Sequence, residues 1–121
     1  MAKTILVIDD TKELVEMLKT LLSVKSYKII AAYDGEEGIS KAQSEFPDLI
    51  LLDVALPKYS GFTVCKKLKA SVEYNKIPII MLTAQSTDED KFLGFQLGAD
   101  AYITKPFNSN ELLQKIDEFL H

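Results

Sequence analysis

The chain has 121 residues, of which 47% are hydrophobic and 26% are charged, and its formal net charge is −4. This length supports one domain with a hydrophobic core and is too short for two. The basic residues are spread along the chain, which argues against a surface for nucleic acid. A single cysteine excludes an internal disulfide, and from the sequence we expect neither a signal peptide nor a membrane-spanning run. We therefore expect a cytoplasmic protein without direct membrane or nucleic-acid binding.

Short apolar runs alternate with stretches of helical periodicity along the chain. The apolar runs predict five strands, over residues 5–8, 28–32, 49–53, 79–83 and 101–104. Apolar residues at three- and four-residue spacing predict helices over 11–24, from 35 to just before 47, after 60, over about 88–97 and after 108. Five βα units without a linker or repeat predict an open, doubly wound α/β fold with one five-stranded parallel sheet.

Several predicted helices carry residues typical of helix ends. Asp10 followed by Glu13 is expected to form a capping box for the first helix. Ser60 and Asn108 are expected to cap the third and the last helix at their N-termini. Gly98 is expected to end the fourth helix, because glycine tolerates the left-handed backbone found there.

Polar residues stand at the carboxyl ends of four predicted strands. Asp9 and Asp10 follow the first strand, Asp53 ends the third, Thr83 ends the fourth and Lys105 follows the fifth. Sheets of this type commonly have the strand order 2-1-3-4-5, and ligands bind where the order reverses. That order makes the first and third strands neighbours. We therefore expect the three carboxylates to lie together.

Three crowded carboxylates repel one another unless a cation joins them. Oxygen ligands of this kind suit Mg²⁺, which takes one or two carboxylates directly and keeps several waters. The Thr83 hydroxyl and the Lys105 ammonium would add a donor and a positive charge for a phosphoryl oxygen. The set predicts a phosphoryl-transfer site in which Asp53 is the nucleophile.

These residues make the chain resemble the receiver domains of bacterial two-component response regulators, in particular those of the chemotaxis type. The resemblance runs from residue 5 to residue 120, and on it we expect residues 1–121 to be one receiver domain with a flavodoxin-like fold. It rests on short motifs in sequence order: Asp9-Asp10, Asp53 followed by Leu56-Pro57 and Gly61, Thr83-Ala84, and Lys105-Pro106-Phe107.

The resemblance implies that Asp53 is the phosphorylation site. It further implies that Asp9, Asp10, Asp53 and the backbone carbonyl of Ala55 hold Mg²⁺. Thr83 and Lys105 would contact the phosphoryl group.

Tyr102 matches the family's switch aromatic, which turns inward as the threonine moves towards the phosphate. A static, half-buried strand tyrosine is the alternative for this residue. The family also implies a cis peptide bond between Lys105 and Pro106.

The resemblance also implies a set of partners. A histidine kinase or a histidine phosphotransfer protein would donate the phosphoryl group, and the domain would catalyse only its own phosphorylation and dephosphorylation. The surface of the fourth helix, the fifth strand and the fifth helix would then signal to a downstream protein.

Three other functions fit the sequence less well. A haloacid dehalogenase-type phosphatase needs two aspartates one residue apart after the first strand, whereas Asp9 and Asp10 are adjacent. A nucleotide- or flavin-binding domain needs a loop rich in glycine, serine or threonine there, and Asp10-Thr11-Lys12 is not such a loop. A receiver-like scaffold that only binds partners remains the third alternative, although every phosphorylation residue is present.

Overall fold

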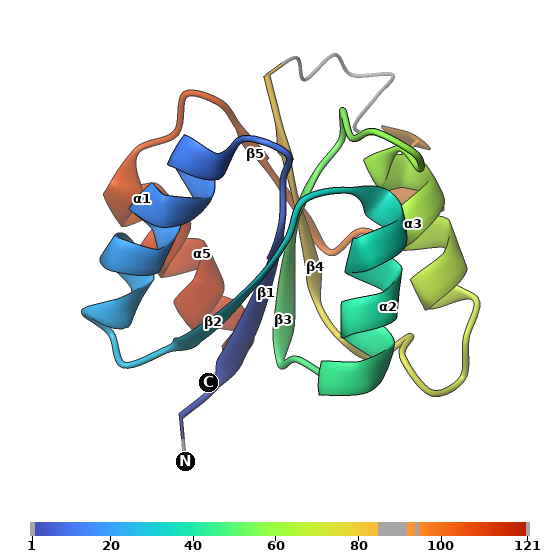
Figure 1. Ribbon diagram of the computed structural model, residues 1–121, viewed down its shortest axis with the longest axis horizontal. Coiled ribbons are helices and arrows are strands. Elements are labelled where there is room, and N and C mark those ends of the chain that lie inside the picture. The colour runs from blue at the N-terminus through green and yellow to red at the C-terminus, as the bar shows by residue number, and fades with distance from the viewer. Residues whose placement is uncertain (1, 85–91, 94, 121) are drawn as a thin grey trace.

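The computed structural model describes residues 2–84, 92–93 and 95–120, which form a parallel sheet between two layers of helices (Figure 1). The strands are β1 Thr4–Ile8, β2 Lys28–Ala32, β3 Leu49–Asp53, β4 Ile79–Thr83 and β5 Ala101–Thr104. The helices are α1 Lys12–Ser23, α2 Gly35–Glu45, α3 Gly61–Lys69 and α5 Ser109–Leu120. The strand order β2-β1-β3-β4-β5 confirms the predicted doubly wound fold. Of the helix predicted over about 88–97, residues 88–91 and 94 lie outside the described residues, while residues 92–93 and 95–96 are helical.

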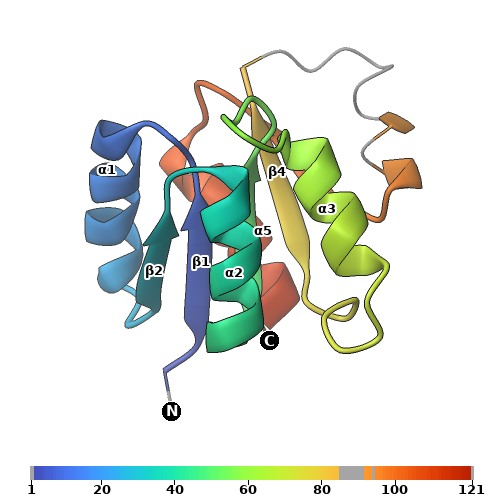
Figure 2. The same ribbon diagram turned by 45° about the vertical axis from the view of Figure 1, so that its right-hand side comes forward.

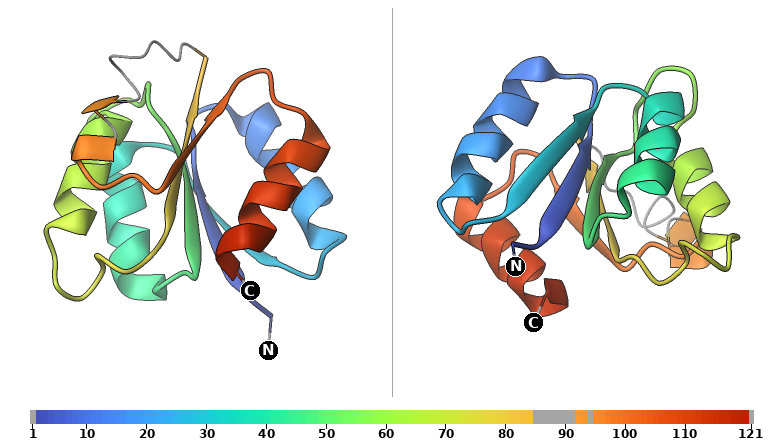
Figure 3. Two further views of the ribbon diagram at one scale, coloured as in Figure 1. Left: turned by 180° about the vertical axis from the view of Figure 1, so that it is seen from behind. Right: turned by 60° about the horizontal axis from the view of Figure 1, so that its bottom comes forward.

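The sheet separates two hydrophobic cores because successive strand residues face opposite sides. In β3, Leu49 and Leu51 pack towards α1 and α5, while Ile50 and Leu52 pack towards α2 and α3. All four are fully buried, as expected for a central parallel strand. Seen from behind, α5 and α1 cover one face of the sheet and α2 and α3 cover the other (Figure 3). Because the strands run parallel, their carboxyl ends lie together at one edge of the sheet, between the two layers of helices.

The capping prediction holds for α3 and α5 and is wrong for α1. Ser60 Oγ accepts from the Thr63 amide at 3.3 Å, and Asn108 Oδ1 accepts from the Asn110 amide at 2.8 Å. The N-cap of α1 is Thr11, and its side chain makes no capping hydrogen bond. The Asp9 carboxylate takes the Thr11 amide instead, at 2.9 Å. Asp10 is exposed beside it, and its carboxylate is therefore available for another role.

One hydrogen bond fastens α5 to the turn before β2. Tyr27 donates its hydroxyl to Asp117 Oδ1 at 2.7 Å. Burial, and then the hydrogen bond to Asp117, raise the pKa of Tyr27 to about 12.

The substitution Tyr27→Phe is expected to lower the free energy of unfolding by about 1 kcal/mol, the usual net contribution of one such hydrogen bond. Denaturant unfolding at neutral pH measures this loss. Because the folded state holds the phenol proton more tightly, this contribution is lost only when the pH rises from about 10 through 12. A phenolate absorbance titration should lose the step near pH 12 in the variant. Equal stabilities of the wild type and Tyr27→Phe would show that the hydrogen bond to Asp117 contributes nothing to the free energy of unfolding. Tyr74→Phe serves as the control for removing a tyrosine hydroxyl.

Candidate functional site

The strand register brings the predicted polar residues together at the edge of the sheet that lies uppermost in Figure 1. Ile8 of β1 pairs with Leu52 of β3, so the residues that follow them, Asp9 and Asp53, are neighbours. The amide of Lys105 donates to the carbonyl of Thr83 at 2.7 Å, which holds the start of the segment after β5 against the end of β4. Four separate strand ends therefore contribute to one site.

The Lys105 ammonium joins two of the carboxylates. Its Nζ lies 2.9 Å from Asp9 Oδ2 and 3.5 Å from Asp53 Oδ1. Asp9 is fully buried, and its other oxygen accepts from the Thr11 amide. Both Asp9 oxygens are thus bonded, which a buried charge requires. The Lys105–Pro106 peptide bond is cis, as the resemblance implied.

Asp53 lies between the interior and the solvent. Only 7% of the residue is exposed, and its Oδ1 accepts a long hydrogen bond of 3.4 Å from the Ala55 amide. Burial raises the pKa of the Asp53 carboxyl and the neighbouring Asp9 raises it further, while the Lys105 ammonium lowers it in part. A carboxylate in this environment is a candidate to bind a cation or to attack an electrophilic centre.

A cavity of about 440 Å³ opens above Asp53. Its walls contain the predicted residues Asp10, Asp53, Ala55, Thr83 and Lys105, together with Val54 and Ala84, which the sequence did not single out as site residues. Ala55 and Ala84 have small side chains, so access to Asp53 stays open. Asp9 is not in the wall, because it lies beneath Lys105 at the end of β1.

The three aspartates fit a metal ion. Each of Asp9, Asp10 and Asp53 offers one carboxylate oxygen, and these oxygens lie within 4.8 Å of one another. A set made only of carboxylate oxygens suits a hard divalent cation such as Mg²⁺. Ala55, whose backbone carbonyl is the remaining predicted ligand, lines the same cavity.

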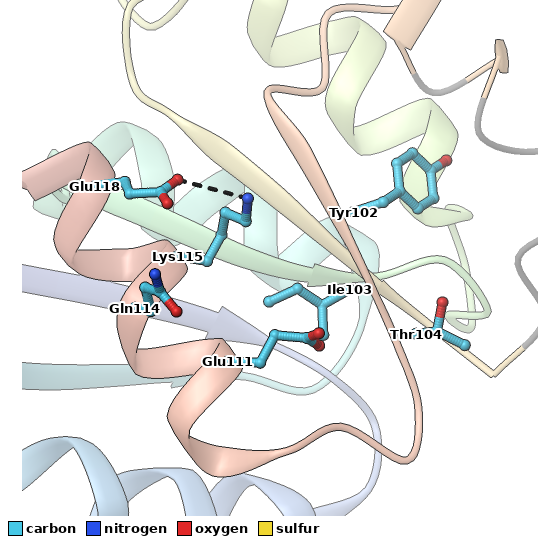
Figure 4. A pocket seen from close by; sticks show the side chains of 7 residues that line it. All are labelled: Tyr102, Ile103, Thr104, Glu111, Gln114, Lys115 and Glu118. Atoms are coloured by element: carbon cyan, nitrogen blue, oxygen red, sulfur yellow. Dashed lines mark ion pairs between the residues drawn. The ribbon is translucent and has the colours of Figure 1, made fainter.

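Tyr102, like Asp9, is a predicted functional residue that does not line this cavity. It is half-buried on β5, and its ring meets the ring of Phe95 edge-on with centroids 5.5 Å apart. Figure 4 shows Ile103 on the α5 side of β5 and the Tyr102 ring on the other side. A second cavity of about 420 Å³ follows this strand, lined by Tyr102, Ile103, Thr104, Glu111, Gln114, Lys115 and Glu118.

Residues 5–117 match the family described as the response regulator receiver domain. The chain belongs to this family. It is 47% identical to the alkaline phosphatase synthesis transcriptional regulatory protein PhoP of Bacillus subtilis, over 99% of this chain and 49% of that protein. The receiver domain thus spans about half the length of this curated relative.

Solved structures agree with this assignment. The receiver domain is similar to the chemotaxis protein CheY4 of Vibrio cholerae, with a TM-score of 0.93 and 32% identity over 98% of this chain and 99% of that one. It is also similar to the receiver domain of the sensor histidine kinase PA1611 of Pseudomonas aeruginosa, with a TM-score of 0.90 and 26% identity over 98% of each chain. That structure has a magnesium ion coordinated in its active site cleft. Among the described residues of our receiver domain, no helix is long and apolar enough to span a bilayer.

Proposed function

We propose that this receiver domain is a phosphoacceptor switch in which Asp53 takes a phosphoryl group in a Mg²⁺-dependent reaction. One observation supports this most strongly. The partly shielded Asp53 carboxylate lies at the floor of an open cavity, with an ammonium 3.5 Å from one oxygen and two further carboxylates within 4.8 Å. Phosphoryl transfer needs a positioned nucleophile and neutralisation of charge on the phosphoryl oxygens.

The proposed step is a displacement at phosphorus. An oxygen of Asp53 forms the new O–P bond, the P–N bond to the histidine of the donor breaks, and the leaving imidazole keeps that electron pair and takes a proton from solvent. Asp9, Asp10, Asp53 and the Ala55 carbonyl would hold Mg²⁺, which would supply charge neutralisation for the phosphoryl oxygens. Lys105 is placed to move its ammonium from Asp53 to a phosphoryl oxygen, and the Thr83 hydroxyl can donate to another.

The domain would act only on itself, accepting the group from a histidine kinase or phosphotransfer protein and later losing it to water. Phosphorylation adds about two negative charges at the site. The output would pass through Tyr102 to the surface of β5, α5 and the helix predicted before Gly98, where a downstream protein binds. We place this switch in the cytoplasm, where such kinases present their catalytic domains.

Intact mass spectrometry after incubation with Mg²⁺ and acetyl phosphate tests the proposal. The wild type should gain one phosphoryl group, and the gain should disappear with EDTA and in Asp53→Ala. Asp48→Ala is the matched control, because Asp48 lies at the opposite end of β3, where its carboxylate accepts from the Thr4 amide at 2.7 Å. That variant should be phosphorylated as the wild type is.

Rapid hydrolysis would hide the adduct, so the same samples are titrated with beryllofluoride, a stable mimic of the phosphoryl group. Binding that requires Mg²⁺ and Asp53 supports the switch. Failure of both measurements would contradict the proposal and favour a scaffold that only binds partners.

A further inference from the structure

The loop between β3 and α3, residues 54–60, lies against the N-terminal end of α2 (Figure 1, Figure 2). Its base is closed by a hydrogen bond of 2.8 Å from the Gly61 amide to the Val54 carbonyl. The residue after Val54 is Ala55, whose carbonyl is expected to hold the metal. The position of this carbonyl therefore depends on how the rest of the loop is fixed.

The loop contacts α2 at Gly35, the first residue of the helix. The Gly35 amide donates to the Pro57 carbonyl at 3.2 Å. A Cβ atom on Gly35 would lie 2.6 Å from the Cβ of Tyr59 and would also collide with the Tyr59 carbonyl oxygen. Only glycine leaves room for the loop backbone at this distance. Any side chain here would push the loop away from the helix.

An ion pair and a ring contact hold the same loop from its outer side. Lys58 has a left-handed backbone, with φ of 67°, and its Nζ lies 3.7 Å from Asp34 Oδ2. Asp34 is the N-cap of α2, and its Oδ1 accepts from the Glu37 amide at 2.7 Å. The Lys67 ammonium lies 5.5 Å from the centre of the Tyr59 ring. The loop is thus held between the cap of α2 and the side of α3.

We propose that the start of α2 positions the β3–α3 loop for metal binding, with Gly35 as the positioning residue that sets the distance between them. This inference rests on the proposed function, because it assigns a role to residues that support the Mg²⁺ site without touching the ion. Mg²⁺ requires near-ideal octahedral geometry, so a small displacement of one ligand lowers its affinity. Substitution of residues that orient metal ligands typically lowers affinity 10- to 100-fold.

The experiment measures Mg²⁺ affinity by titration calorimetry and by amide shifts in NMR spectra, without any phosphoryl donor. Gly35→Ala should raise the Mg²⁺ Kd about tenfold and shift the Ala55 amide even before Mg²⁺ is added. Gly38→Ala is the matched control on the same helix, because its new Cβ would lie 2.7 Å from the far end of the Ile8 side chain and not near the loop. It should lower the thermal midpoint and leave the Kd unchanged.

If Gly35→Ala fails to fold, Lys58→Asn still decides the question. Asparagine accepts the left-handed backbone better than lysine does, so this variant removes the ion pair without straining the loop. It should raise the Kd by a smaller factor of about two to three, in line with a weak exposed ion pair.

The outcomes separate the inference from the function on which it rests. If the wild type binds Mg²⁺ and the variants Gly35→Ala and Lys58→Asn bind it equally well, the positioning role alone is overturned. A wild-type protein that binds no Mg²⁺ would overturn the proposed function and this inference together. A raised Kd in both variants, with the control unchanged, supports the inference.

Discussion

The substitution Asp53→Asn is expected to raise the free energy of unfolding of the metal-free domain by about 1–2 kcal/mol while abolishing phosphoryl acceptance. Asp53 is nearly buried beside Asp9, and the two carboxylates share one ammonium. Burial and the Asp9 charge raise the Asp53 pKa in the folded state. A carboxyl with a raised pKa favours the folded state as the pH falls through that pKa, and its ionised form costs stability at neutral pH. Asparagine keeps the shape and removes the charge.

Guanidinium unfolding in EDTA measures the difference between Asp53→Asn and the wild type. The gain should shrink in acid, where wild-type Asp53 is itself protonated. Mg²⁺ should stabilise the wild type more than the variant, since the variant has lost one ligand charge. Asp48→Asn, at the far end of β3, should show no such gain. A variant less stable than the wild type at neutral pH would mean that Lys105 outweighs the repulsion from Asp9.

Lys105→Met is expected to have the opposite and larger effect, a loss of about 3 kcal/mol in the metal-free domain. Asp9 is fully buried, and its Oδ2 loses its ammonium partner at 2.9 Å in this variant. A buried charge left without a partner typically costs 3–5 kcal/mol, and the 22% exposure of the Lys105 side chain favours the lower end. Phosphorylation should also slow strongly, because no ammonium remains to meet the phosphoryl group.

Mg²⁺ provides the decisive comparison for this variant. The ion replaces the missing positive charge, so it should restore more stability to Lys105→Met than it adds to the wild type. Lys115→Met is the matched control, because Lys115 lies on the surface and, among the described residues, forms an ion pair with Glu118 alone, at 3.5 Å. That change should stay within about 0.5 kcal/mol. Equal losses of unfolding free energy in Lys105→Met and Lys115→Met would show that the Lys105–Asp9 pair stabilises the fold no more than an exposed ion pair does.

The fold and the grouping of the site were accessible from the sequence because both follow from strand ends. Four of the five apolar runs stop at a polar residue, and the strand order then places Asp9 beside Asp53 without any knowledge of side-chain geometry. The cap of α1 was not accessible in this way. Both Asp9 and Asp10 have a side chain suited to capping, and only the backbone path after β1 decides that Asp9 takes the Thr11 amide.

The sequence also did not reveal the partner of Lys105. The motif places an ammonium near Asp53, but the structure brings it closer to Asp9, at 2.9 Å rather than 3.5 Å. That choice depends on where the segment after β5 leaves the sheet. The contact of Gly35 with Tyr59 was hidden for a similar reason, since it joins the start of α2 to a loop that is distant in the chain.

The Lys105 ammonium acts as an internal counter-ion for the acidic site. An entering cation meets charges that are already partly balanced, so its binding free energy is reduced by the ion pair that it loosens. We therefore expect the domain to fold without the metal, and occupancy of the proposed Mg²⁺ site to follow the free concentration of the cation. A structural metal site, by contrast, holds its ion permanently. The same lysine that pairs with Asp9 in the metal-free protein would thereby keep the ion exchangeable.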